Sequence, residues 1–293
     1  MGNKKRLCIG IIIFTLLFSL GVVVIAIKKS NYSWAKDCRT IAHAFGGIDG
    51  YTYTNSMEAF LYNYEKGHRV FEVDFSITAD NVLVAAHDWK MFYQLTGRSL
   101  EEGETAQPLT LEQFKESKIY NKYTPLSWKD IMILMQQYPD IYIVTDTKDK
   151  EDPMITNAFT QIVNEAMELG ENSGRKILKR VIPQIYNPEM YDIICEIYPW
   201  KSSIYTLYNL PKNKFSYEEV YQFIVGNNIK IVTTYDQRIN FSFAREIQDM
   251  GGYLYMHTYN DASVVKRLIE LYGIHGVYTD YLAPDDVKEV FEK

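Results

Sequence analysis

The stretch Val70–Asp88 reads VFEVDFSITADNVLVAAHD and contains two short apolar runs that are joined by polar turn residues. Glu72 and Asp74 stand two residues apart within the first run, and the second run ends at His87. Because side chains alternate along a β-strand, the two carboxylates point to the same face. Two like charges inside a core are costly unless a cation lies between them. The stretch therefore predicts a buried strand that carries cation ligands, followed by a second run that ends on a histidine.

Strand-like and helix-like segments alternate from Thr40 to the C-terminus. The predicted strands are Thr40–Ala44, Val70–Ile77, Val82–Ala86, Ile141–Thr145, Val181–Ile185, Ser203–Leu207, Ile229–Thr233, Gly252–His257 and Gly276–Thr279. The predicted helices are Ser56–Glu65, Ser127–Tyr138, Met154–Leu169, Pro188–Ile197, Tyr217–Gly226, Phe241–Met250, Ala262–Tyr272 and Asp285–Glu292.

This alternation is typical of a parallel sheet covered by helices, and eight units in about 250 residues fit a closed (β/α)8 TIM barrel. A doubly wound open sheet is the alternative fold. Val82–Ala86 is a ninth run, which we expect to extend the second strand or its loop. The polar, weakly patterned segment Gly97–Thr124 predicts a surface insertion with one short helix.

Polar residues close several of the apolar runs, and in a barrel the carboxyl ends of the strands form the active face. Hard cations such as Mg²⁺ and Ca²⁺ prefer oxygen ligands, so a cluster of carboxylates there predicts a divalent metal site. Two histidines beside the metal suit phosphodiester cleavage, since one can take a proton from the attacking hydroxyl and the other can protonate the leaving oxygen. A lysine would offset charge on the phosphoryl oxygens. The candidates are His43 and His87 for catalysis, Glu72, Asp74 and Asp146 for the metal, and Lys148 for phosphate.

Each candidate also has a structural alternative, as a salt-bridged acid or a hydrogen-bonded core histidine. We expect that structural role for His68 and His275. The 24 tyrosines leave a similar choice. Seven fall near predicted strand ends, where they either contact carbohydrate or, as we expect first, pack at the bases of loops. These are Tyr51, Tyr53, Tyr186, Tyr208, Tyr235, Tyr259 and Tyr281.

The order of these residues resembles the motifs of the glycerophosphodiester phosphodiesterase family, within a superfamily of phospholipase C-like barrel enzymes. The resemblance runs from about Thr40 to the C-terminus and implies a metal-dependent phosphoric diester hydrolase. The markers are His43-Ala44-Phe45 at the family's His-Arg-Gly position, the asparagine-bearing segment 53–60, Glu72-x-Asp74, Thr78-x-Asp80, His87-Asp88, Pro125-Leu126-Ser127, Asp146-x-Lys148, Gln184, Thr258 to Asn260, and Thr279-Asp280-Tyr281.

Four positions depart from the family pattern. The motif arginine is replaced by Ala44, and a metal-binding glutamate is replaced by Thr54. Asp146 stands where glutamate is usual, and His257 stands where a tryptophan is expected. The related sphingomyelinase D enzymes also lack that arginine and that glutamate, and His43, Glu72, Asp74, His87, Asp146 and Lys148 match their reduced metal site residue by residue.

The resemblance to sphingomyelinase D implies that a substrate hydroxyl attacks phosphorus and that a cyclic phosphate forms. It leaves the phosphate contact of the missing arginine to another residue. Asn55 is the candidate for binding phosphate or a substrate hydroxyl in its place. Gln184 and His257 are further candidates for substrate contact, with His257 expected to form a wall of the site.

The N-terminus differs in composition from the rest of the chain. Residues 7–27 (LCIGIIIFTLLFSLGVVVIAI) carry no charge and are long enough to cross a bilayer, for which about 20 apolar residues suffice. The basic cluster before this segment predicts a single-pass signal anchor with residues 1–6 in the cytoplasm, a juxtamembrane linker at 28–38 and an extracellular barrel at 39–293. A cleaved signal peptide is the alternative.

The charge and cysteine content exclude other classes. Beyond residue 29 the chain carries 26 basic and 37 acidic residues, which argues against nucleic acid as a partner. Cys38 and Cys195 are the two cysteines outside the apolar segment and form no disulfide framework, so an ordinary core must provide stability.

These features predict a membrane-anchored, extracellular phosphodiesterase that needs Mg²⁺ or Ca²⁺. The expected substrates are phosphodiesters at the membrane or cell-wall surface, namely lipid headgroups, deacylated phospholipids or glycerol-phosphate wall polymers. Two alternatives remain: a phospholipase C-like lyase that works without metal, and a barrel that binds a phosphorylated glycan or lipid without turnover.

Overall fold

The computed structural model describes residues 32–148, 151–208 and 216–292 of the chain. Two units divide the chain, Met1–Asp37 and Cys38–Lys293. Within the first unit the structure describes helix α2 (Ser33–Asp37), a short helix in the segment that we predicted to be a linker.

The predicted cytoplasmic segment 1–6 and transmembrane segment 7–27 lie outside the described residues. Among the residues that are described, none forms a helix that is both apolar enough and long enough to span a bilayer.

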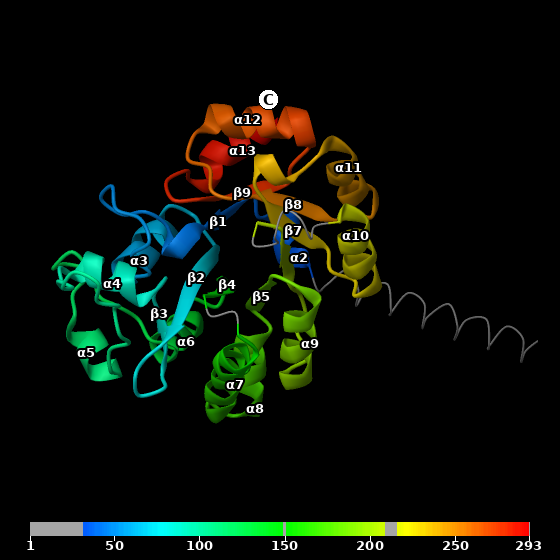
Figure 1. Ribbon diagram of the computed structural model, residues 1–293. Helices are drawn as coiled ribbons and strands as arrows, with labels where there is room; N and C mark the ends of the chain where they lie inside the picture. Colours follow the sequence, from blue (N-terminus) through cyan, green and yellow to red (C-terminus); the bar gives the residue numbers. More distant parts are fainter. Residues whose placement is uncertain (1–31, 149–150, 209–215, 293) are drawn as a thin grey trace, which may run out of the picture. The chain divides into compact units, whose positions relative to one another are not determined.

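The second unit is a closed β/α barrel (Figure 1). Within the described chain, eight parallel strands form its wall. They are β1 (Thr40–Ala42), β2 (Val70–Ile77), β4 (Tyr142–Thr147), β5 (Val181–Ile185), β6 (Ile204–Thr206), β7 (Ile231–Thr234), β8 (Tyr253–Met256) and β9 (Gly276–Thr279). Strand β1 pairs in parallel with both β2 and β9, so the sheet closes on itself. The TIM barrel prediction is confirmed, and the doubly wound open sheet is excluded.

Strand β2 shows how the sequence makes this wall. All eight of its residues are buried, and the pleat divides them between two environments. Phe71, Val73 and Phe75 join the core that the strands share with the surrounding helices. Glu72 and Asp74 alternate with them and therefore occupy the other face.

The ninth predicted run is strand β3 (Leu83–Ala85), which pairs antiparallel with the second half of β2. The amide of Ala86 donates to the carbonyl of Asp74 at 3.0 Å. His87, which follows Ala86, therefore lies near the carboxylates of β2.

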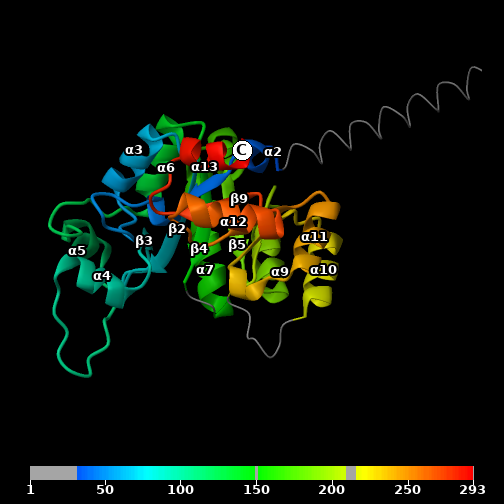
Figure 2. The same ribbon diagram turned by 90° about the horizontal axis from the view of Figure 1, so that it is seen from above.

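The eight predicted barrel helices are all present and surround the strands (Figure 2). They are α3 (Met57–Glu65), α6 (Trp128–Gln137), α7 (Asp152–Glu168), α9 (Pro188–Ile197), α10 (Tyr217–Gly226), α11 (Phe241–Asp249), α12 (Ala262–Tyr272) and α13 (Pro284–Glu292). Side-chain caps start several of them, as expected for Ser, Asn and Asp before a helix. Ser127 and Asp130, for example, form a complete capping box at α6.

Among the described residues of this unit, three further short α-helices lie outside the barrel repeat. Helix α5 (Leu111–Glu116) is the one expected within the insertion 97–124. Helices α4 (Trp89–Thr96) and α8 (Glu171–Leu178) were not predicted. The α8 segment contains Gly174 and has few apolar residues, so its sequence alone shows little sign of a helix.

Strand β1 ends at Ala42, two residues earlier than predicted. The following residues, His43–Phe45, form a 3-10 turn in which Ala44 (φ 49°) and Phe45 (φ 66°) adopt left-handed backbone conformations. Such conformations cannot continue a strand. The turn therefore stops β1 and places His43 at the carboxyl-terminal rim of the barrel.

Candidate active site

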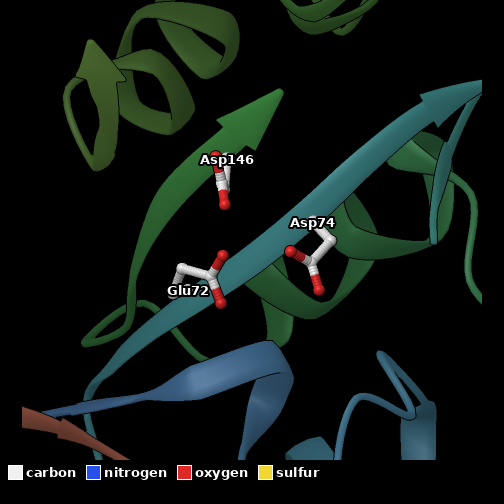
Figure 3. Close-up of side chains that lie close together, drawn as sticks. All are labelled: Glu72, Asp74 and Asp146. Carbon is white, nitrogen blue, oxygen red and sulfur yellow. The ribbon is translucent and has the colours of Figure 1, made fainter. Parts of the chain in front are cut away.

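Three buried carboxylates converge at the rim, as predicted. Glu72 and Asp74 lie on β2 and Asp146 lies on β4, where it is the register partner of Asp74. Ligand atoms from all three lie within 4.8 Å of one another, and Figure 3 shows their carboxylate groups directed toward a common space. The fully buried Glu72 and Asp74 are 0% exposed and Asp146 is 3% exposed.

The donor set fits a hard divalent cation. Glu72 Oε1 and Asp146 Oδ1 are buried and have no hydrogen-bond partner among the described residues. A buried carboxylate oxygen without a partner is costly, and a bound cation would satisfy it. The two oxygens could therefore serve as ligands of a metal that all three acids share.

The carboxyl pKa values reflect this crowding. Burial and the neighbouring charge of Asp74 hold the pKa of Glu72 well above its usual value. Burial also raises the pKa of Asp146, against the opposing effect of Lys148. Burial acts to raise the pKa of Asp74 too, but the charges of Lys148, His43 and His87 outweigh it and lower the pKa to about 2.

Lys148 lies directly against the acids. Its Nζ forms ion pairs with Asp74 Oδ1 at 2.6 Å and with Asp146 Oδ2. These charges raise the pKa of Lys148 above its ordinary range, although burial opposes them, so the ammonium stays charged. Because the side chain is still 23% exposed, the ammonium also borders solvent on the cavity side.

His43 is buried and held by a carboxylate at the end of β9. Its Nδ1 bonds Asp280 Oδ1 at 2.9 Å. Asn260 donates to the second oxygen of Asp280 at 2.8 Å and accepts from the Asp280 amide at 2.7 Å. Burial lowers the pKa of His43, but the Asp280 hydrogen bond and the charges of Glu72 and Asp74 outweigh it and raise the pKa to about 9.

His87 follows β3 and is half-buried. Its Nδ1 bonds Asp88 Oδ2 at 2.6 Å, while Asp88 Oδ1 caps helix α4 by accepting from the Met91 amide at 2.7 Å. The Asp88 carboxylate thus fixes both the helix start and the histidine. The ring nitrogen of His87 that does not contact Asp88 remains for a substrate.

The side chain of Tyr53 connects the two histidines. Its ring makes edge contacts with His43 and with His87, at centroid distances of 4.6 and 5.4 Å. The two imidazoles are therefore gathered around one aromatic ring, beside the carboxylates, although they are 44 residues apart in the chain.

Ala44 and Thr54, which depart from the family pattern, and Asn55 all form hydrogen bonds within the protein. Ala44 has no side chain to contact phosphate, but its amide donates to Glu72 Oε2 at 2.7 Å. Thr54 is buried and shares a hydrogen bond with Ser56, so it does not take the place of a metal-binding glutamate. Asn55 donates to Asp74 Oδ2 at 2.9 Å and accepts from the Asp74 amide at 3.2 Å. These bonds favour a role for Asn55 in positioning Asp74.

Aromatic residues line the other side of the site. Gln184 is fully buried and is held between two tyrosine hydroxyls, donating to Tyr208 at 2.9 Å and accepting from Tyr278 at 2.7 Å. His257 stands as a half-buried wall residue, with its ring 4.9 Å from that of His43 and 5.0 Å from that of Tyr208. Burial and the charges of His43 and Lys148 hold the pKa of His257 well below its usual value, so its ring is neutral.

A cavity of about 350 Å³ opens beside these groups. Carboxylate, ammonium and imidazole groups line it together with two tyrosines, so a bound phosphodiester could contact all of them. The residues that line it are His87, Asp88, Asp146, Thr147, Lys148, Tyr186 and Tyr208.

His68 and His275 lie outside this arrangement, as expected. His68 contacts Thr40 at the first residue of β1 and the carbonyl of Leu282, and His275 contacts Arg39. Neither residue contacts the acids or the two rim histidines.

Sequence reasoning named Asn260 and Asp280 only as family markers, and it expected Tyr53 and Tyr208 to pack at loop bases or contact carbohydrate. It did not connect any of the four to the two histidines or the acids. Asp280 carried a signal, because a carboxylate directly after an apolar strand falls at the active rim. Tyr53 carried none, because its contacts with both histidines depend on a loop whose left-handed residues, including Tyr53 itself (φ 57°), are not evident from the sequence.

Comparison with known proteins agrees with the geometry. Residues 47–283 match the model of the glycerophosphoryl diester phosphodiesterase family. No curated protein matches the chain at a significant level.

Solved structures share the fold at low sequence identity. A glycerophosphodiester phosphodiesterase from Parabacteroides distasonis is 17% identical, with a TM-score of 0.65 over 88% of this chain and 98% of that one. An Oleispira antarctica phosphodiesterase in complex with the product sn-glycerol-3-phosphate is 15% identical, with a TM-score of 0.65 over 90% of this chain and 99% of that one. The family match spans most of the sequence, and the chain belongs to the glycerophosphoryl diester phosphodiesterase family, whose members are phosphoric diester hydrolases.

Proposed function

We propose that this protein is a metal-dependent phosphodiesterase with a reduced, sphingomyelinase D-like metal site. Glu72, Asp74 and Asp146 would hold Mg²⁺ or Ca²⁺, and His43 and His87 would exchange protons with the substrate. The observation that carries the proposal is the placement of both imidazoles around Tyr53, beside three buried carboxylates with unsatisfied oxygens.

The charge balance supports a divalent ion. When ionised, Glu72, Asp74, Asp146 and Asp280 supply four negative charges, against the positive charges of Lys148 and protonated His43. Two positive charges from a cation would neutralise the remainder. A bound divalent metal would act as a Lewis acid on a phosphoryl oxygen.

The two histidines differ in a way that suits acid-base catalysis. The raised pKa of His43 favours its protonated form, which can donate a proton to the leaving oxygen as its bond to phosphorus breaks. His87, whose Nδ1 is bonded to Asp88, can take the proton from the attacking hydroxyl as the new oxygen–phosphorus bond forms. Lys148 would donate hydrogen bonds to the phosphoryl oxygens. A second, hydrolytic step would reverse the two histidine roles.

The proposed substrates are glycerophosphodiesters. A solved neighbour with the same fold holds the product sn-glycerol-3-phosphate. In such a substrate a hydroxyl stands beside the ester, so internal attack would give a cyclic phosphate before release. Deacylated phospholipids, glycerol-phosphate wall polymers with free hydroxyls, and those lipid headgroups that carry a hydroxyl beside the ester all have this chemistry.

Phosphorus NMR tests the proposal directly. The barrel protein is incubated with a glycerophosphodiester and Mg²⁺, Ca²⁺ or EDTA, and a resonance of a cyclic phosphate or phosphomonoester should grow only with metal. His43→Ala and His87→Ala should each abolish turnover while the circular dichroism spectrum stays unchanged. Full activity after exhaustive EDTA would favour the metal-independent lyase. Binding without turnover in every condition would favour the non-catalytic barrel.

We also propose that residues 7–27 anchor the protein in the membrane, with residues 1–6 cytoplasmic, 28–38 as a linker and 39–293 outside the cell. The support is the uncharged 21-residue segment and its flanking basic residues. Protease treatment of intact cells should digest the barrel, whereas a barrel protected until lysis would contradict this orientation.

A further inference from the structure

Three tyrosines from distant parts of the chain form an exposed aromatic surface. Tyr51, Tyr120 and Tyr281 are 41, 37 and 40% exposed, so they do not simply pack at loop bases. The rings of Tyr51 and Tyr120 are stacked, with centroids 3.9 Å apart and planes inclined by 26°. The Tyr281 hydroxyl donates to the carbonyl of Gly50 at 2.9 Å. We call these three residues the tyrosine platform.

Two tight turns present the stacked pair. One turn runs from Ile48 to Tyr51, and the other from Ile119 to Lys122. Both central residues of each turn have positive φ, which is the pattern of a type I′ turn. Glycine, asparagine and aspartate suit such positions, whereas Tyr120 at φ 51° is strained. The turn chemistry therefore does not explain an aromatic residue at position 120.

A cluster of three side chains connects the two turns. Asp49 in the first turn forms an ion pair with Lys122 in the second, and it accepts a hydrogen bond from the Tyr123 hydroxyl at 2.8 Å. Tyr123 is completely buried, and its ring meets that of Tyr51 at a centroid distance of 6.3 Å. The platform is thus preorganised, and ligand binding would not have to order it.

Two platform residues lie close in the sequence to residues of the His43 side of the active site. Tyr51 precedes by two residues Tyr53, whose ring contacts both histidines. Tyr281 directly follows Asp280, which bonds His43. The cavity with His87 and Lys148 borders the same site but has its own pair of tyrosines. A phosphodiester has two arms, so the arm that does not enter this cavity would need a second surface.

We propose that the tyrosine platform is a saccharide subsite, which binds the sugar ring of a glycosylated phosphodiester while its phosphate lies between His43 and His87. This inference rests on the proposed function, since it names the substrate class of that site. A sugar ring offers a flat C–H face for the aromatic rings and hydroxyl groups for the phenols.

The local charge favours a neutral ligand. The Asp49 carboxylate is already paired with Lys122, and the Lys122 ammonium lies 5.0 Å from the Tyr123 ring centroid and is 62% exposed. Because the two charges of this pair cancel, no free carboxylate remains beside the platform to attract a cationic headgroup, which would otherwise suit an aromatic surface. An acyl chain would cover the phenol hydroxyls without bonding them, at a desolvation cost.

The main test compares two soluble substrates. One is a glycerophosphodiester with a hexose headgroup, and the other is glycerophosphoethanolamine. Tyr120→Asn suits the type I′ turn and should keep the fold while removing the ring. For this variant we expect the KM of the hexose diester to rise about five- to tenfold, the scale of one lost aromatic contact, with kcat within twofold. The KM of glycerophosphoethanolamine should stay within twofold of wild type.

Tyr62→Ala is the matched control, because Tyr62 is also a 41% exposed tyrosine but lies on α3. It should change neither KM. Equal losses on both substrates in Tyr120→Asn, or an unchanged KM for the hexose diester, would overturn the inference. Loss of binding to phosphatidylglycerol vesicles together with an unchanged hexose KM would identify a lipid contact instead and would also overturn it.

A binding experiment separates this inference from the proposed function. Saturation-transfer NMR with methyl glucoside and methyl galactoside needs no turnover. Binding to the wild-type protein that is lost in Tyr120→Asn would support the subsite even if no diester were cleaved. Saturation transfer to the glycosides that is equal with the two proteins, or absent with both, would refute the inference even if glycerophosphoethanolamine were cleaved.

Discussion

At the scale of single residues, protons, Lys148 and the proposed metal would compete for the same three carboxylates. Glu72 and Asp146 each keep one buried oxygen without a hydrogen-bond partner, while Lys148 contacts Asp74 and the second oxygen of Asp146. Burial and the charge of Asp74 favour the protonated form of Glu72 in the metal-free protein. A metal must therefore displace a proton as well as water, which couples its affinity to pH.

We expect metal binding to release protons and to weaken as the pH falls. Because the pKa of Glu72 is raised, the acid holds its proton at pH values where an ordinary glutamate is ionised, and the metal competes with that proton. Titration calorimetry in buffers of different ionisation enthalpy measures the protons released. Glu72→Gln should bind metal more weakly and release fewer protons. Equal proton release by the variant and the wild type would contradict this assignment.

Asp280→Asn should lower the pKa of His43 and weaken the fold below neutral pH. The pKa of His43, about 9, lies above its ordinary value of 6.5, so the stabilisation from protonated His43 is complete below about pH 6.5. It is lost as the pH rises through about 9. NMR titration of the metal-free proteins checks the pKa, and urea unfolding at pH 6 and pH 10 checks the stability.

The wild type should exceed Asp280→Asn in free energy of unfolding at pH 6, and the difference should shrink by pH 10. A difference that does not depend on pH would show that Asp280 only packs. Turnover should fall about 100-fold or more, within the range for loss of acid-base function.

At the scale of secondary-structure elements, a short return strand and the start of a helix place the candidate catalytic groups. Strand β3 runs back along β2 and ends next to Asp74, so His87 reaches the carboxylates. Helix α4 then begins immediately, with Asp88 as its cap. The Asp88 carboxylate therefore both caps helix α4 and bonds His87, and different substitutions should separate these two roles.

Asp88→Ala should lose about 1 kcal/mol of stability, the usual cost of removing an N-cap, together with the bond to His87. Asp88→Ser should recover most of the stability, because serine also caps helices, but its hydroxyl does not supply the carboxylate that orients His87. Urea unfolding and kcat measure the two effects. We expect kcat to stay reduced at least tenfold in both variants. Recovery of kcat in Asp88→Ser would show that the cap alone matters.

The sequence predicted most elements because their apolar patterns are local. The alternation in β2 and the caps before α3 and α6 are visible in a few residues each, and so were the acids and histidines at strand ends. Contacts between distant segments were not visible in this way. They include the two hydrogen bonds between Asn55 and Asp74, the bond from His43 to Asp280, and the tyrosine platform. The early end of β1 depends on a left-handed alanine, for which a side-chain pattern gives no signal.

At the scale of the whole barrel, one tight contact near the closing strands supports the geometry of the site. Strand β9 pairs with β1 on one side and β8 on the other, and the residue that follows it, Asp280, holds His43. Its first residue, Gly276, is packed so closely that an added Cβ would lie 2.4 Å from the carbonyl oxygen of Arg39 and 2.7 Å from the Tyr255 ring. Backbone and a buried ring cannot easily yield.

Gly276→Ala should therefore destabilise the barrel, by about 1–3 kcal/mol as for other overpacked sites. For a domain of this size that corresponds to a fall in Tm of about 2–4 °C per kcal/mol. Gly226→Ala is the matched control, because nothing lies within 4 Å of the added Cβ. At the C-terminal end of α10 this change should leave the Tm equal or slightly higher.

Because β9 positions Asp280, Gly276→Ala should also reduce kcat at temperatures where the protein is still folded. An unchanged Tm in Gly276→Ala would mean that β9 shifts without cost and that closure of the barrel does not fix the position of His43.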